Sequence, residues 1–355
     1  PAVWNTAMVF FQAALLAGYA YAHASTAWLG VRRQPVWRLL VLALPLLVLP
    51  LAVPAGWTPP ADRHPAPWLL ALMAAGVGLP FFALAATTPL IQRWFAATGH
   101  PRAADPYFLY AASNAGSLLA LLGYPLLVEP SLTLPQQGWW WTAGYLVFAG
   151  LMILCVLALW RGRVAGTAPA SVEPAAPPGS SPTAAVRLRW VLLSFVPSSL
   201  LLGVTLYLSS DIAVVPLLWV VPLALYLLTF VIAFARRPML PPALAARMLP
   251  LLLVPVAMLL AVQAAQPAAL LAAFHLAAFF IAALLCHQQL AASRPPPAHL
   301  TEFYLWMSVG GVLGGIFNAF AAPLIFDTVV EYPLMIVLAC MAALPAAADR
   351  SRRAR

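Results

Sequence analysis

A stripe of polar side chains inside an apolar segment is the first candidate for chemistry in this chain. The stripe lies in residues 106–127 and consists of Tyr110, Ser113, Asn114 and Ser117. Positions three and four apart share one face of a helix, so these groups point the same way. Hydroxyls and amides in that position can bind a solute, or they can hydrogen-bond a neighbouring helix. The sequence leaves both roles open.

A second stripe lies in residues 302–325. Its members are Tyr304, Ser308, Gly311, Gly315 and Asn318. Overlapping G-x-x-x-G pairs, Gly310 with Gly314 and Gly311 with Gly315, favour close contact between helices. A deep amide needs a hydrogen-bonding partner, so Asn318 is a candidate either for a structural bond or for a solute contact.

Three titratable residues are further candidates, because ionisable groups inside a membrane segment are costly and often functional. We expect His287 and Glu302 on neighbouring helices, where a His–carboxylate pair could relay protons or bind an amine. In the alternative interpretation, Glu302 interacts with the dipole of its own helix. Asp211 lies in a short turn, where its carboxylate could meet a cationic ligand or cap the next helix.

No other catalytic signature is evident. The sequence contains no metal-ligand spacing, no phosphate-binding G-x-x-x-x-G-K-[ST] loop and no nucleophile motif. We therefore predict no catalytic residue, no cofactor and no metal. The 18 basic residues are all Arg, scattered between apolar runs, and do not predict a nucleic-acid partner.

The composition shows which elements must position these residues. The chain is 64% hydrophobic and 8% charged, with a mean hydropathy of +0.92. A soluble domain of this size needs a polar surface that this chain cannot supply. The partner is therefore a lipid bilayer, and the fold class is an all-α polytopic membrane protein. About 11 transmembrane helices are predicted, at 3–24, 36–55, 67–92, 106–127, 139–160, 188–208, 213–235, 246–265, 267–289, 302–325 and 328–348.

The arginines support this number of helices. With these spans, 17 of the 18 Arg, Arg38 among them, fall in loops on one side, which the positive-inside rule makes cytoplasmic. The C-terminus is then cytoplasmic, and we expect the inner membrane of a bacterium. The first residue would lie outside, so we also expect one further helix upstream, for a total of about 12.

The chain divides into two halves that resemble each other. Residues 1–163 form a half with five spans, 164–187 a disordered cytoplasmic linker, and 188–355 a half with six spans. With a shift of 195 residues, 89–117 align without gaps on 284–312. Both segments are helix, turn and helix in the same orientation. This parallel repeat is the arrangement of the two halves of major-facilitator transporters.

Four motifs carry a resemblance to a known family. They are VWNTAMVFFQAALLAGYAYAH (3–23), DPYFLYAASNAGSLLALLGYPLLVEP (105–130), LSSDIAVVPLLWVVPLALYLLTF (208–230) and HLTEFYLWMSVGGVLGGIFNAF (299–320). In these the chain resembles the membrane region of multi-pass spermidine-synthase-like proteins, also described as fused major-facilitator/spermidine synthase. Many of those proteins carry a soluble aminopropyltransferase-like domain with a Gly-rich loop, which this sequence does not contain.

Two functions follow as expectations. The first is a transporter-like protein that binds or moves a small cationic solute, of the amine or polyamine type, by alternating access. The resemblance implies the amine. The second is a membrane-anchoring module for a soluble synthase-like domain or partner on the cytoplasmic side. The substrate-binding candidates in either case are Tyr110, Asn114, Ser117, Asp211, His287, Glu302 and Asn318.

Overall fold

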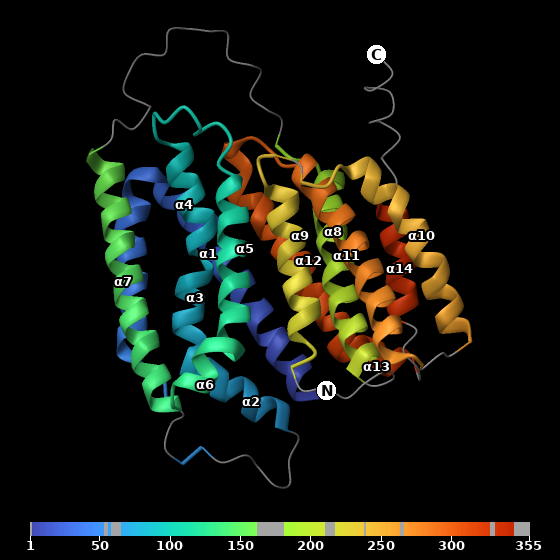
Figure 1. Cartoon of the computed structure of the whole chain (residues 1–355). Helices are drawn as coiled ribbons and strands as arrows, with labels where there is room; N and C mark the ends of the chain where they lie inside the picture. The colour runs from blue at the N-terminus through green and yellow to red at the C-terminus, as the bar shows by residue number, and fades with distance from the viewer. Residues whose placement is uncertain are drawn as a thin grey trace, which may run out of the picture.

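The computed structural model describes residues 2–52, 56–57, 65–161, 181–209, 217–237, 239–262, 266–326 and 331–343. Within these ranges the chain forms helices and short turns and contains no strand. The helices run roughly parallel, side by side, in one bundle (Figure 1). The predicted all-α fold class is confirmed.

The first half is built from a kinked helix and three further passes. Its helices are α1 (Ala2–Ala43), α2 (Pro65–Met73), α3 (Leu79–Ala85), α4 (Thr87–Ala96), α5 (Phe108–Gly123), α6 (Glu129–Ser131) and α7 (Leu134–Arg161). Gly30 has a φ of 62°, a left-handed value that glycine adopts easily. The chain reverses there, so α1 supplies two passes, and α2, α3 and α4 together form a third.

The second half contains six passes. Its helices are α8 (Ala184–Tyr207), α9 (Val220–Phe234), α10 (Pro242–Ala261), α11 (Ala268–Ala292), α12 (Leu300–Ile316), α13 (Ala322–Ile325) and α14 (Glu331–Ala343). α8 begins at Ala184, so its first four residues fall within the predicted linker, and residues 164–180 of that linker lie outside the described ranges.

The passes agree with the predicted number. In the described ranges, 8 helical segments are long and apolar enough to cross a membrane, and Val220–Phe234 and Glu331–Met341 are shorter apolar helices. The part of α1 after Gly30 adds the remaining pass. The reversal of α1 near Arg33 and the loops that carry Arg102, Arg237 and Arg294 lie at the same end of the bundle, which we call the Arg-rich end (Figure 1).

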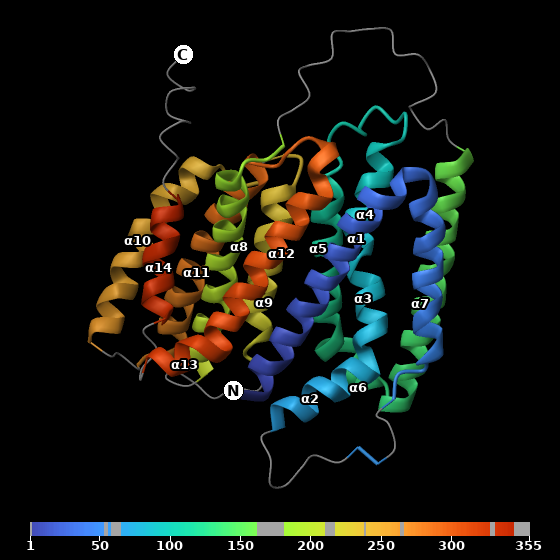
Figure 2. The same cartoon turned by 180° about the vertical axis from the view of Figure 1, so that it is seen from behind.

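Two helix pairs join the halves. α1 packs along α12, and α5 packs along α9 (Figures 1 and 2). The sequence repeat relates α5 to α12, and the order of the passes relates α1 to α9. Exchanging the halves therefore converts one pair into the other, as expected for a parallel repeat.

α8 is the most enclosed helix of the second half and packs against α9, α11, α12 and α14. Close contact with α12 depends on glycine. A Cβ added to Gly310 would clash with the Val191 carbonyl oxygen, and one added to Gly314 would lie 2.8 Å from that of Phe195. Among the described residues of the first half, no helix takes a place equivalent to that of α8.

Candidate functional site

A cluster of neutral polar groups joins α1 of the first half to α8 and α12 of the second. The Gln12 Nε2 donates to Ser198 Oγ at 3.1 Å, and Ser198 Oγ donates to the Gly311 carbonyl oxygen at 2.9 Å. The Gln12 amide lies against Gly315, where an added Cβ would clash with its Oε1. That Oε1 atom is buried and accepts no hydrogen bond in the described structure.

Asn318 extends this cluster along α12. Its Nδ2 donates to Ser199 Oγ at 2.5 Å and to the Gly314 carbonyl oxygen at 3.0 Å. Asn318 lies in a π-helical turn at Phe317–Ala321, a distortion that is frequent at functional sites. We call Gln12, Ser198, Ser199 and Asn318 the polar cluster. Both halves contribute to it, so a relative movement of the halves must change it.

An aromatic layer lies between the polar cluster and the Arg-rich end. Its members are buried or nearly so and come from four helices: Tyr19 of α1, Tyr110 of α5, Phe230 and Phe234 of α9, and Tyr304 of α12. The Tyr110 ring is at the centre, with ring centroids of Phe234 and Tyr304 both 5.0 Å away. On α1, Gln12 precedes Tyr19 by seven residues, or about 10 Å along the helix.

One hydrogen bond ties this layer across the two halves. Tyr304 of α12 donates its hydroxyl to the Gln92 Oε1 of α4 at 2.9 Å. Gln92 is fully buried, and its Nε2 has no partner in the described structure. The repeat aligns Gln92 with His287.

At the Arg-rich end, the two repeat-related loops contact each other. The Tyr107 hydroxyl donates to the Pro295 carbonyl oxygen at 2.7 Å, and Arg294 pairs with Asp105 at 2.9 Å. Burial raises the pKa of Tyr107, so the phenol keeps its proton and remains a donor. Arg93 also donates to the Pro297 carbonyl oxygen at 3.3 Å. We call these contacts the loop lock.

Three of the predicted residues lie on the interface between the halves. Tyr110 is at the centre of the aromatic layer, and Asn318 belongs to the polar cluster. Asn114 is buried beside Tyr110 and donates to its carbonyl oxygen at 2.9 Å. Ser117, on the same helix, is exposed.

The structure does not bring His287 and Glu302 together, and each residue has other partners. His287 lies on the face of α11 that meets α9, where its Nδ1 shares a hydrogen bond with Thr229 Oγ1 at 2.8 Å and its ring stacks on Phe230. Glu302 pairs with Arg187 at 2.7 Å and with His299 at 3.3 Å. Asp211 lies outside the described residues.

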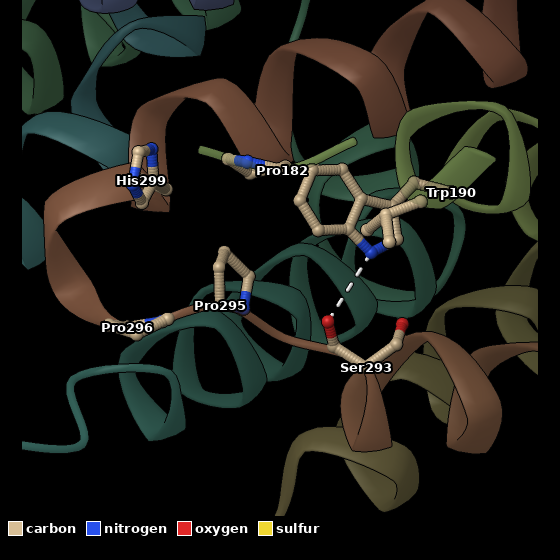
Figure 3. A pocket seen from close by; sticks show the side chains of 7 residues that line it. Pro182, Trp190, Ser293, Pro295, Pro296 and His299 are labelled. Atoms are coloured by element: carbon tan, nitrogen blue, oxygen red, sulfur yellow. Dashed lines mark hydrogen bonds between the residues drawn. The ribbon is translucent and has the colours of Figure 1, made fainter. Parts of the chain in front are cut away.

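A small cavity lies near Glu302 at the Arg-rich end (Figure 3). Its volume is about 190 Å³, and its lining consists of Pro182, Val186, Trp190, Ser293, Pro295, Pro296 and His299. The Trp190 indole N–H donates to the Ser293 carbonyl oxygen at 3.3 Å across one wall. The lining is mainly apolar, with His299 as its titratable side chain. Among the described residues, no group of three His, Cys, Asp or Glu side chains could hold a metal ion.

Sequence reasoning missed Gln12, Gln92, Ser198 and Ser199. Gln12 is the single amide between Thr6 and Gly30, and Ser198–Ser199 follow a proline in an apolar helix. Each was a visible signal, because a deep polar side chain needs a partner. The partners could not be identified from periodicity, because they are far away along the chain: Ser199 is 119 residues from Asn318, and Tyr304 is 212 residues from Gln92.

No protein-family model matches the sequence, and no curated protein gives a significant match. A solved structure, that of the human organic anion transporter MFSD10 (TETRAN), is similar to this chain with a TM-score of 0.53 and 17% sequence identity. The alignment covers 95% of this chain and 83% of that chain. The likeness shows a major-facilitator-like transporter fold, and it gives no support to the resemblance to spermidine-synthase-like proteins.

Proposed function

We propose that this protein moves a small solute across the membrane by alternating access, along a path bounded by α1, α5, α9 and α12. The observation that carries the proposal is the polar cluster. Neutral donors and acceptors from both halves meet there, with a buried acceptor, Gln12 Oε1, left unpaired. Transporters built from repeats bind their solutes at such an interface near the midplane.

The contacts of α5 support a form that is closed at the Arg-rich end. Tyr107, Tyr110, Ala111 and Asn114 are buried at the start of this helix. From residue 115 to residue 131, none of the side chains is buried. The buried side chains of α5 therefore lie beside the aromatic layer and the loop lock, and the polar cluster would be reached from the opposite end.

We infer that the Arg-rich end faces the cytoplasm and that the protein lies in a bacterial inner membrane. The arginine distribution supports this orientation through the positive-inside rule. In this orientation the C-terminus is cytoplasmic, and the form described would take up solute from outside.

For the solute we propose a small amine. Tyrosine and phenylalanine ring faces attract cations, and five such rings form the aromatic layer. The free amide oxygen of Gln12 accepts hydrogen bonds, as an ammonium group requires. Tyr110, Asn114 and Asn318 would contact the solute along this path. The other candidates have no described contact with the path: Asp211, His287, Glu302 and Ser117.

The experiment is uptake into proteoliposomes, with radiolabelled spermidine, a neutral amino acid and a dicarboxylate as solutes. We expect saturable spermidine uptake that falls about tenfold in Gln12→Ala, because a buried hydrogen bond to a charged group is lost. Glu129→Gln is the matched control, since Glu129 is exposed at the opposite end of the bundle from the loop lock.

Each other outcome would count against a part of the proposal. Saturable uptake of the dicarboxylate alone would overturn the amine and keep the transporter. No saturable uptake of any solute by folded protein would contradict transport itself. The membrane-anchoring function, which no contact among the described residues favours, would then be tested by searching for a soluble partner.

A further inference from the structure

Arg38 is a charged side chain in the interior of the first half. The sequence places Arg38 in a loop. In the structure the chain reverses at Gly30 and continues as a helix, and Arg38 lies eight residues after Gly30, or about 12 Å along this second part of α1. Its side chain is 0% exposed. The second part of α1 packs there against α3 and α7 (Figure 2).

The guanidinium is only partly satisfied by its neighbours. Its Nη2 donates to the Ala83 carbonyl oxygen and, at 2.6 Å, to Thr87 Oγ1. α3 ends at Ala85 and α4 begins at Thr87, so these acceptors lie at a break between two helices. The Nε and Nη1 atoms of Arg38 are buried and donate to no described group.

No carboxylate of the described residues pairs with Arg38. Among the described residues, the Arg–carboxylate pairs join Arg187 to Glu302 and Arg294 to Asp105, and both pairs lie at the Arg-rich end. A buried charge without a counter-charge is strongly destabilising, and more so inside a membrane protein. The environment of Arg38 therefore calls for a negative charge that these residues do not provide.

Further donors gather around the guanidinium. The Tyr21 hydroxyl is buried and interacts with Arg38 electrostatically; Ser25 lies beside it, but no group accepts its proton in ordinary hydrogen-bond geometry. Tyr145 also interacts with Arg38 but donates its hydroxyl to the Leu42 carbonyl oxygen at 2.8 Å. Around the Arg38 guanidinium, hydrogen-bond donors without a partner thus outnumber acceptors without a partner. Such a surplus of donors is what an anion, which only accepts hydrogen bonds, requires.

We propose that Arg38 and Tyr21 bind a small inorganic anion, such as chloride, inside the first half. The complete enclosure of the Arg38 side chain by protein atoms selects against large organic anions. The bound anion neutralises the guanidinium and accepts hydrogen bonds from Nε or Nη1 and from the tyrosine hydroxyl. It thereby stabilises the contact of the second part of α1 with α3 and α4, independently of the transported solute.

The test compares the thermal unfolding midpoint of the purified protein in nanodiscs in chloride and in gluconate at the same ionic strength. We expect chloride to raise the midpoint in a saturable way, because an anion that binds the folded form alone stabilises it. Arg38→Gln should abolish this dependence. Arg33→Gln, an exposed arginine in the same part of α1, should leave it unchanged.

Equilibrium binding of radioactive chloride measures the same site directly. Tyr21→Phe removes one donor without removing the charge, so the chloride affinity should fall about tenfold even if Arg38→Gln fails to fold. Equal midpoints in chloride and gluconate for the unmodified protein would overturn the proposal, and would mean that water or a neutral group satisfies Arg38. Undiminished chloride affinity in Tyr21→Phe would also contradict it.

Discussion

The two helix pairs that join the halves are related by the repeat, yet they are built differently. Beside the Tyr19–Tyr304 ring contact, the α1–α12 pair has polar contacts. Gln12 lies against Gly315 of α12 and donates to Ser198 of α8, and near the Arg-rich end His23 Nδ1 shares a hydrogen bond of 3.1 Å with Thr301 Oγ1. The α5–α9 pair is aromatic. On α5, burial ends at Asn114, whereas α12 has buried residues along its whole length.

This difference indicates how the halves could move. α12 is also held by α8, so the α1–α12 contact keeps the halves in register, while α5, whose side chains beyond Asn114 are not buried, can separate from α9 when the aromatic layer opens. Interfaces of this kind switch between discrete packings more readily than they deform. The polar cluster consists of amides and hydroxyls, so its rearrangement does not expose a buried charge.

The largest expected effect concerns the support of α12 by α8. Gly310→Ala places a Cβ against the Val191 carbonyl oxygen, a backbone atom that cannot move aside. We expect the free energy of unfolding to fall by about 3 kcal/mol, measured by chemical denaturation. Gly311→Ala is the control, because nothing lies within 4 Å of its Cβ position. Equal losses in both variants would refute the close packing of α8 on α12.

A smaller effect is expected from Tyr304→Phe in the aromatic layer. The variant leaves the Gln92 amide buried without any partner, at a cost of about 1–3 kcal/mol to the closed form. The accessibility of a cysteine introduced at the Arg-rich end should therefore increase. Tyr19→Phe keeps its ring in the same layer and should change this accessibility little. The closure model fails if the two variants behave alike.

Tyr107→Phe tests the loop lock itself. Loss of the bond to the Pro295 carbonyl oxygen should cost the closed form about 1 kcal/mol. In the unmodified protein the lock should persist at pH 10.0, the ordinary pKa of tyrosine, because burial raises the pKa of Tyr107. The contribution is lost as the pH rises through this raised pKa. Opening already at pH 9 to 10 without a change at other groups would contradict the assignment.

The smallest effect is expected at the ion pair of Asp105 with Arg294. Both side chains are exposed, Asp105 at 57% and Arg294 at 37%. A double-mutant cycle of Asp105→Asn and Arg294→Gln should give a coupling below about 0.5 kcal/mol. A large coupling would mean that charge, rather than the Tyr107 hydrogen bond, holds the loops together.

The sequence predicted the elements better than their contacts. Apolar runs and the alternation of Arg loops predict the passes, since both depend on local composition. The same alternation misplaced Arg38, because the turn at Gly30 is tight enough to return the chain to the interior within eight residues. An arginine inside WRLLVLALPLLVL was the available signal.

The candidate site was predicted only in part. Asn318, Tyr110 and Asn114 could be identified from helical spacing, because a polar face on an apolar helix must meet something polar. Their partners could not, since Gln12 and Ser199 come from helices remote in sequence. The structure does not bring Glu302 and His287 together, because the helices that carry them, α12 and α11, both pack against α8 rather than along each other.

The most direct test of alternating access is a distance measurement across the Arg-rich end. Spin labels at Ala104→Cys and Ala298→Cys, both exposed and one in each loop of the lock, would be measured by pulsed electron resonance in nanodiscs, with the three native cysteines replaced. We predict one short distance in the unmodified background and a second, longer distance in Tyr304→Phe or with bound solute. A single unchanged distance under all these conditions would contradict the account.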